Sequence, residues 1–182
     1  LRLRIIGNLV MWYLFAVLVI LFVYDLRYGL VPDRVVLPAI VVALLHTVIL
    51  SGAKDPVIIP TGFLTEWNPA LSSALVRGFG MTAVGIIVGA GFFWLQYALS
   101  RGRWLGAGDI RIGALMGAML GWPFIIEGIV VSYILGGVVG ALLLATGRKK
   151  FGQTVPLGTF LTLGAAITFL YGQDIWQWYF GS

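Results

Sequence analysis

The sequence predicts an all-α membrane protein with about six transmembrane helices, forming one domain over residues 1–182. Hydrophobic residues make up 60% of the chain and charged residues only 10%, and the mean hydropathy is +1.00. A soluble domain of this length could not bury so much apolar surface. In a membrane protein the positions of the Lys and Arg residues set the orientation, so the net charge of +5 does not indicate binding to nucleic acid. We expect the lipid bilayer as a partner and no nucleic acid.

Six apolar runs define the expected helices. They are Ile5–Tyr24, Val35–Ser51, Leu75–Leu99, Ile110–Gly121, Phe124–Ala145 and Thr154–Tyr171. About 20 helical residues cross the hydrocarbon core, so the fourth run is short and we expect its helix to begin near Leu105. The stretch Gly121-Trp122-Pro123 predicts a tight turn, because Pro cannot continue the helix before it.

The loops set the expected orientation. The longest, Gly52–Ala74, predicts an exposed excursion, and two crossings separate Asp25 from Asp109, so both lie on one side. That side carries Arg27, Arg34, Arg101, Arg103, Arg111, Arg148, Lys149 and Lys150, and the other carries Arg2, Arg4, Lys54 and Arg77. The excess of basic residues predicts that the aspartates face the cytoplasm. The stretch Gln173–Ser182, with its Trp and Tyr residues, would then form an aromatic belt at the outer interface.

Asp25 and Asp109 are the candidate catalytic residues. Asp25 follows the first apolar run and Asp109 immediately precedes the fourth, in a chain with only seven acidic residues. Ionisable groups near the membrane interior are costly and point to function. Two close carboxylates can share a proton, so that one activates water while the other polarises a carbonyl. Either aspartate taken singly could instead be a structural cap or an ion-pair partner.

The residues before Asp109 strengthen this interpretation. Gly106-Ala107-Gly108-Asp109 lets the backbone approach other groups closely just ahead of the acid. Such a stretch would let an extended substrate lie against the carboxyl. A GxGD string alone is a weak signal among 25 glycines, but here it directly precedes an apolar helix and is matched by a second acid.

Three segments together resemble one protein family. The first, residues 25–38, is similar to the pattern D-x6-P-[DN]-x4-P. The second, residues 106–111, is the GxGD stretch with Ile110 and Arg111, and Gly117 follows eight residues after Asp109. The third, residues 155–164, matches the pattern [IV]-P-[FL]-G-x-[FY]-L-x-L-G. These segments are similar to those of the type IV prepilin peptidases, which are GxGD-type intramembrane aspartyl proteases. The family usually has Lys where Arg111 stands.

The resemblance implies an aspartic endopeptidase of the bacterial inner membrane. It would cleave pilin-like precursors, each with a basic leader and an apolar helix, at the cytoplasmic interface. On this resemblance Asp25 and Asp109 form the catalytic pair, without metal or other cofactor. The residues that shape the motifs or bind substrate would be Gly106, Gly108, Arg111, Pro156 and Gly158.

One part of the family pattern is missing. Bifunctional members have an N-terminal segment with paired CxxC motifs, linked to methylation of the new pilin N-terminus. This chain has no Cys, so either the segment was removed with upstream residues or the protein only cleaves. For the chain as given we expect peptidase activity alone, and use of S-adenosylmethionine is not implied.

Other residues have simpler interpretations. Asp33, after Pro32 and ahead of an apolar run, is expected to cap a helix, because the family pattern allows Asn there. Two sets of glycines are expected in close helix packing, or alternatively along a substrate groove: Gly85, Gly89 and Gly91, and Gly136, Gly137 and Gly140. The arginines 101, 103 and 111 satisfy the positive-inside rule, or else bind lipid headgroups or an acidic substrate residue.

Two alternative functions stay open. One is a preflagellin-type or presenilin-like GxGD protease with another substrate. The other is a non-enzymatic transporter or channel in which the two aspartates coordinate protons or cations. A transporter would more often show internal repeats, and the sequence has none.

Overall fold

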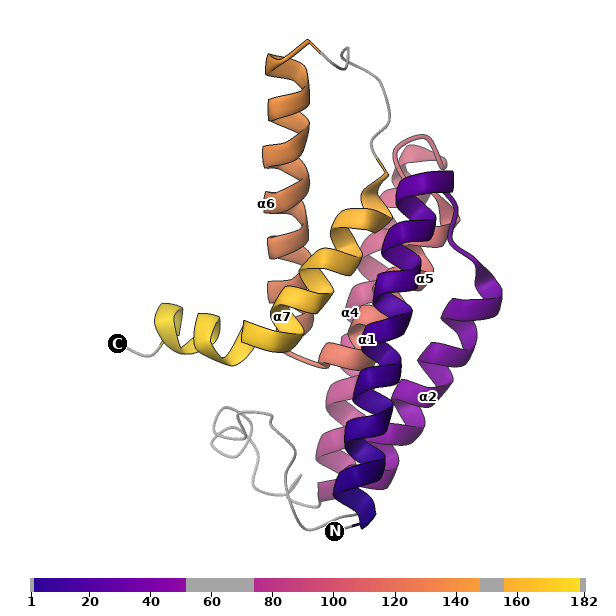
Figure 1. Ribbon diagram of the computed structural model, residues 1–182, viewed down its shortest axis with the longest axis vertical. Coiled ribbons are helices and arrows are strands. Elements are labelled where there is room, and N and C mark those ends of the chain that lie inside the picture. The colour runs from indigo at the N-terminus through magenta and orange to yellow at the C-terminus, as the bar shows by residue number, and fades with distance from the viewer. Residues whose placement is uncertain (1, 52–73, 148–155, 181–182) are drawn as a thin grey trace.

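The computed structural model describes residues 2–51, 74–147 and 156–180, and the regular structure in these ranges is entirely helical. Six helices follow one another along the chain (Figure 1). They are α1 (Arg2–Tyr28), α2 (Asp33–Ser51), α4 (Ala74–Ser100), α5 (Ala107–Leu120), α6 (Phe124–Ala145) and α7 (Leu157–Phe180). Each predicted apolar run corresponds to one of them, which confirms the all-α class.

Three segments are long and apolar enough to cross a membrane: Ile5–Tyr28, Phe79–Ser100 and Phe124–Ala145. Many large apolar side chains on these segments are exposed, among them Trp12, Ile87 and Ile134. A surface of this kind suits contact with lipid rather than water. The length and composition of these helices are those of a membrane protein. The predicted loop 52–74 lies outside the described residues except for its last residue, and Arg148, Lys149 and Lys150 lie outside them too.

Two helices extend beyond their predicted ends. The first continues past Tyr24, so Asp25 lies within its last turns, and Gly29 ends it with a φ of +60° and an N–H bonded to the Asp25 carbonyl at 2.7 Å. A left-handed glycine of this kind is a common helix stop. The last helix begins at Leu157 rather than Thr154 and continues to Phe180, and its final turns bend sideways (Figure 1). The helices are longer than the apolar runs because helical hydrogen bonding continues through the polar residues beyond each run.

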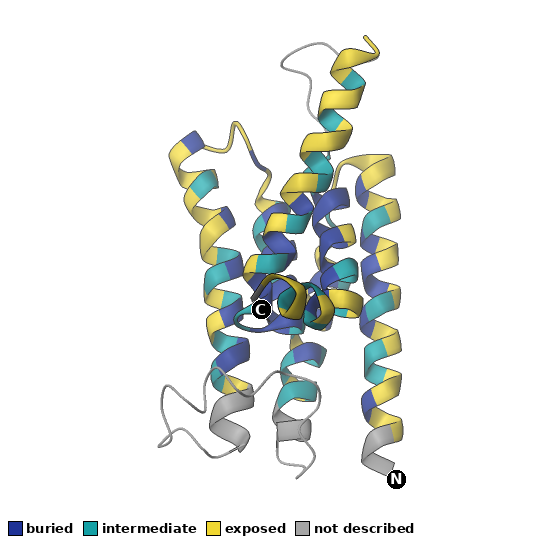
Figure 2. Ribbon diagram, turned by 90° about the vertical axis from the view of Figure 1, so that its left-hand side faces the viewer, coloured by how far each residue is buried: buried dark blue, intermediate teal, exposed yellow. Residues whose placement is uncertain are grey.

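The fourth predicted helix, α5, lies at the centre of the bundle. It contacts α2, α4, α6 and α7, and most of its side chains are buried, including Ile112, Leu115 and Met116. The same hydrophobic core includes Leu18 and Leu21 of α1, Val36 of α2, Phe93 of α4 and Leu161 of α7. Figure 2 shows the buried residues gathered on the inward sides of the helices. The short helix that follows the GxGD stretch is therefore the core of the fold.

Glycines bring α5 against α4. A Cβ atom at Gly117 would collide with the backbone of Gly85, and one at Gly113 would collide with the ring of Phe93 and with the carbonyl of Gly89. Only glycine allows backbones to approach this closely. The packing prediction is confirmed for Gly85 and Gly89.

Other glycines do not pack as expected. A Cβ atom at Gly91, Gly137 or Gly140 would meet no atom of the described structure within 4 Å. The packing prediction is wrong at these three positions, because they face away from the neighbouring helices. Gly136 is different, since a Cβ there would lie 3.4 Å from the ring of Phe160.

The turn from α5 to α6 lies at Gly121-Trp122-Pro123, as predicted. Gly121 adopts a φ of +67°, and α6 begins at Phe124, directly after Pro123. The backbone N–H of Trp122 donates to the carbonyl oxygen of Met81 at 2.9 Å, so α4 also holds this turn.

The last two helices pack closely only along part of their length. A Cβ at Gly164 of α7 would collide with Ser132 of α6, so the first half of α6 lies against α7. The second half of α6 diverges from the rest of the bundle (Figure 1).

Candidate active site

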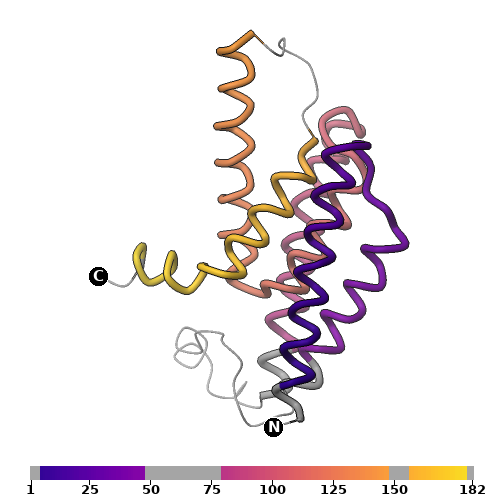
Figure 3. The backbone as a smooth tube through the Cα atoms, in the orientation of Figure 1, coloured from indigo at the N-terminus to yellow at the C-terminus, as the bar shows by residue number. Residues whose placement is uncertain are grey.

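Asp25 lies at the point where the first and the last helices meet. Its side chain is 5% exposed. The backbone N–H of Thr159 donates to Asp25 Oδ2 at 2.6 Å, and the Thr159 hydroxyl donates to the same oxygen at 2.9 Å. In Figure 3 the end of α1 and the beginning of α7 lie at the same end of the bundle.

The start of α7 explains this contact. The first N–H groups of a helix have no partner within the helix, and they carry the positive end of its dipole. Thr159 is the third residue of α7, so its N–H is one of these free donors. The carboxyl of Asp25 therefore caps α7 from another helix.

Gly158 makes the approach possible. A Cβ atom there would lie 2.9 Å from Cγ of Asp25 and 2.9 Å from Cδ1 of Ile112. A side chain would push α7 away from both α1 and α5. The motif residue Gly158 is thus needed for close contact, and Pro156, partly buried, directly precedes the helix.

Asp109 is the third residue of α5 and is 9% exposed. Its Oδ2 accepts the backbone N–H of Gly106 at 3.1 Å, and its own N–H donates to the Gly106 carbonyl at 3.1 Å. The side-chain bond is one half of a capping box, in which an acidic third residue reaches back to the N-cap, and the N-cap glycine has no side chain to supply the other half. The carboxyl is held by its own helix start.

The two glycines of the GxGD stretch have different surroundings. A Cβ at Gly108 would lie 2.7 Å from Cγ2 of Val31, so glycine there lets the connection between α1 and α2 lie against α5. A Cβ at Gly106 would meet nothing closer than Oδ2 of Asp109 at 3.9 Å. Glycine at position 108 is needed for close packing against Val31, whereas the space beside Gly106, next to the carboxyl group of Asp109, is unfilled.

The two carboxyl groups interact electrostatically. Asp109 lies outside the three segments that could cross a membrane. Burial raises the pKa of Asp109 to about 6, the Gly106 N–H opposes this rise, and the negative charge of Asp25 adds to it. Ile112, which lies one turn after Asp109, is also next to Gly158 and so close to Asp25. The structure therefore brings the two predicted residues into one site.

Each carboxyl group also retains a free oxygen. The bonds described above use Oδ2 of both residues. The buried side-chain atoms that lack a partner in the described part of the chain belong to His46, Gln96, Glu127 and Thr168. No oxygen of Asp25 or Asp109 is among them, and Oδ1 of each residue takes part in none of the hydrogen bonds described above.

Asp33 and Arg111 form an ion pair between α2 and α5. Asp33 is the first residue of α2, and the carbonyl of Pro32 accepts the N–H groups of Val35 and Val36 at 3.0 and 3.2 Å. A capping role for Asp33 stays a prediction, but the partner that the structure gives its carboxylate is Arg111. Both side chains are largely exposed.

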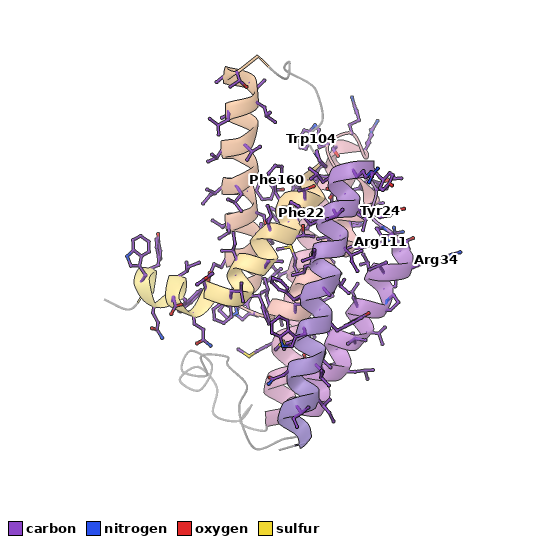
Figure 4. The ribbon with its side chains drawn as sticks, in the orientation of Figure 1. Phe22, Tyr24, Arg34, Trp104, Arg111 and Phe160 are labelled. Atoms are coloured by element: carbon purple, nitrogen blue, oxygen red, sulfur yellow. The ribbon has the colours of Figure 1, made fainter. Side chains whose placement is uncertain are left out.

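The aromatic residues around this end come from several elements. Figure 4 labels Phe22 and Tyr24 on α1, Phe160 on α7 and Trp104 in the turn before α5, with Arg34 pointing outward from α2. Arg101 and Arg103 lie in the same turn and are exposed. Within the described ranges, no three His, Cys, Asp or Glu side chains gather into a possible metal site.

Thr159 is the residue that the sequence did not reveal. It occupies the variable position directly after Gly158 in the third motif, so the motif pattern gives it no weight. Its place in the first turn of a helix was a usable signal, because free N–H groups there attract a carboxylate. The identity of that carboxylate depends on how α1 and α7 pack.

Comparisons with known proteins show the family of this chain. The sequence profile described as the type IV leader peptidase family matches residues 12–141, a range that contains both aspartates. A prepilin leader peptidase/N-methyltransferase of Xanthomonas campestris pv. campestris is 29% identical over 152 residues, which are 83% of this chain and 46% of that protein. A protein of the same name from Aeromonas salmonicida is 27% identical over 173 residues, 95% of this chain and 53% of its own length.

The matched part is shorter in other relatives. The protein of this name from Burkholderia pseudomallei is 33% identical over 93 residues, 49% of this chain and 30% of the relative. The chain thus spans at most about half the length of these relatives. No solved structure matches the chain. The profile match covers most of the sequence and includes both buried aspartates, and the chain therefore belongs to the type IV leader peptidase family.

Proposed function

We propose that this chain is an intramembrane aspartic endopeptidase that removes the leader from prepilin-like precursors. The observation that carries the proposal is the placement of two buried carboxyl groups, from α1 and α5, near the same contact between Gly158 and Ile112. Membership of the leader peptidase family supports the reaction class, and the names of the relatives support the substrate class.

The proposed chemistry uses one proton shared between Asp25 and Asp109. In the proposed pair the shared proton lies on Asp109, whose pKa burial raises, and Asp109 donates a hydrogen bond to the oxygen of the scissile carbonyl. Asp25 then takes a proton from a water molecule, whose oxygen attacks the carbonyl carbon. The tetrahedral intermediate then loses the amine, which leaves with a proton from the pair. General acid–base catalysis of this kind accelerates a reaction by about 10²–10⁴-fold.

The proposed topology has six membrane helices with the aspartates at the cytoplasmic face. Three segments are long and apolar enough to cross a membrane. In this proposal the other three helices pack between or beside them, in an inner membrane of a bacterium. The basic residues of the turn before α5, Arg101 and Arg103, support a cytoplasmic site by the positive-inside rule.

The relatives' name joins two activities, a peptidase and an N-methyltransferase. For the residues of this chain we propose the peptidase alone, because hydrolysis is the activity that a pair of aspartates can carry out. No cofactor enters this chemistry.

The test is cleavage of a peptide with a basic leader and an apolar helix by the purified protein in liposomes. Asp25→Asn and Asp109→Asn should each lower the rate by about 10²–10⁴-fold or more, and the double variant should lose little further, because the two groups act as a unit. Asp174→Asn is the matched control, since Asp174 is an exposed aspartate of α7.

The controls separate the alternatives. Full cleavage by either dyad variant would rule out the aspartyl mechanism. A protein that folds but cleaves no such peptide, and that moves protons or cations across the liposome membrane in an Asp25-dependent way, would favour the transporter alternative.

A further inference from the structure

Thr159 gives both of its hydrogen-bond donors to a single oxygen of Asp25. The backbone N–H donates at 2.6 Å and the hydroxyl at 2.9 Å, both to Oδ2. Thr159 is 4% exposed, so water cannot easily replace either donor. A carboxyl group otherwise rotates broadly about its terminal torsion. Two donors from one residue fix the plane of the group and select which oxygen stays free.

Three other serine and threonine hydroxyl groups of the bundle behave differently. Those of Thr47, Ser132 and Thr146 each donate to a carbonyl four residues earlier in their own helix. This back-bonding is the ordinary way to satisfy a hydroxyl on an apolar helix. The hydroxyl of Thr159 instead crosses to α1, and its own carbonyl accepts the hydroxyl of Thr162 at 2.9 Å.

We propose that Thr159 is a positioning residue for the peptidase: it holds Oδ2 of Asp25 so that Oδ1 faces the attacking water. The inference rests on the proposed function and adds a residue to its site. The donation is charge-assisted when Asp25 is ionised, and such hydrogen bonds are the shorter and stronger kind. Gly158 supports the same geometry, since only glycine lets α7 approach the carboxyl.

The experiment compares three variants of the full chain in liposomes. Thr159→Val removes the hydroxyl with little change in shape and should lower kcat about tenfold while KM stays near the wild-type value. Thr159→Ser keeps the donor and should restore kcat to within about twofold of wild type. Thr168→Val is the control, because Thr168 is a buried threonine of the same helix whose hydroxyl has no partner in the described part of the chain.

Three kinetic results would overturn the inference. The first is an unchanged kcat in Thr159→Val, and the second is an equal loss in Thr159→Val and Thr159→Ser. The third is a loss in Thr168→Val as large as that in Thr159→Val, which would indicate a general effect on packing. If the wild type cleaves and Asp25→Asn does not, such results count against Thr159 alone and leave the proposed function standing.

A second measurement does not depend on turnover. The infrared difference between the wild type and Asp25→Asn isolates the carboxyl band of Asp25. That band should shift in Thr159→Val, which has lost one donor to Oδ2, and should stay in place in Thr168→Val. A band that does not move in Thr159→Val overturns the inference even if the wild type cleaves no test peptide.

Discussion

Where α4 meets α5, four glycines bring two backbones into contact, whereas in the second half of α6 two glycines face open space. Gly85 and Gly89 lie against Gly113 and Gly117 with no room for a methyl group, but Gly137 and Gly140 have no described neighbour within 4 Å of a Cβ position. Both regions combine glycines with apolar residues. The two regions differ in whether the backbone of another helix lies opposite the glycines. The sequence of one helix does not show which of its faces meets another helix.

The difference bears on the candidate site. Helix α5 carries Asp109 and is fixed by close backbone contact, so the carboxyl at its start has a defined position. The end of α6 carries no candidate residue and has few neighbours. Tight packing is therefore found where the proposed chemistry requires precision.

The largest effect should come from breaking the tight contact. Gly117→Ala places a methyl group against the backbone of Gly85 and Ile86, and neither backbone can move without separating the helices. We expect a loss of about 3 kcal/mol of stability, the upper end of the usual cost of overpacking, and loss of most peptide cleavage, since Asp109 moves with α5. Thermal unfolding in detergent and the cleavage rate measure the two effects. Wild-type stability and activity in this variant would show that the α4–α5 contact is looser than the structure indicates.

A smaller effect should come from the ionic attachment of the same helix. Arg111→Gln removes the ion pair with Asp33, but both partners are largely exposed, so the expected loss of stability is below about 1 kcal/mol. The charge-swapped double variant, Asp33→Arg with Arg111→Asp, should recover the unfolding temperature lost in Arg111→Asp alone. Failure to recover would mean that the two charges do not act as a pair.

The smallest effect should come from filling the open region. Gly137→Ala adds a methyl group where nothing lies within 4 Å, and alanine favours a helix by about 1 kcal/mol over glycine. We expect unchanged cleavage and a slightly higher unfolding temperature. A destabilised Gly137→Ala protein would mean that this half of α6 has a close neighbour, and the comparison between the two regions would then fail.

The sequence predicted the helices well, because a long apolar run in a membrane must satisfy its backbone hydrogen bonds internally, and a helix does so. It placed the end of α7 at Tyr171, because the polar residues Gln173 and Asp174 interrupt the apolar pattern without interrupting the helix. It treated Gly91 like Gly85 and Gly89, because spacing along one helix does not say which face meets a neighbour. These errors concern contacts between elements rather than the elements themselves.

The candidate site divides in the same way. Asp25 and Asp109 stand out as acids at the ends of apolar runs, and their catalytic roles stay predictions. The ion pair between Asp33 and Arg111 and the contact between Gly108 and Val31 join residues far apart in the chain. Thr159 was missed for the same reason, since its importance depends on the position of α1 and not on its own motif.

The bond between Asp25 and Thr159 joins residues 134 positions apart, one in the first helix and the other in the last. A ribosome therefore completes α1 long before it produces the group that holds Asp25. At every earlier stage of synthesis, the carboxyl of Asp25 lacks both of these donors. The order of translation thus delays the finished arrangement of this site until α7 has been made.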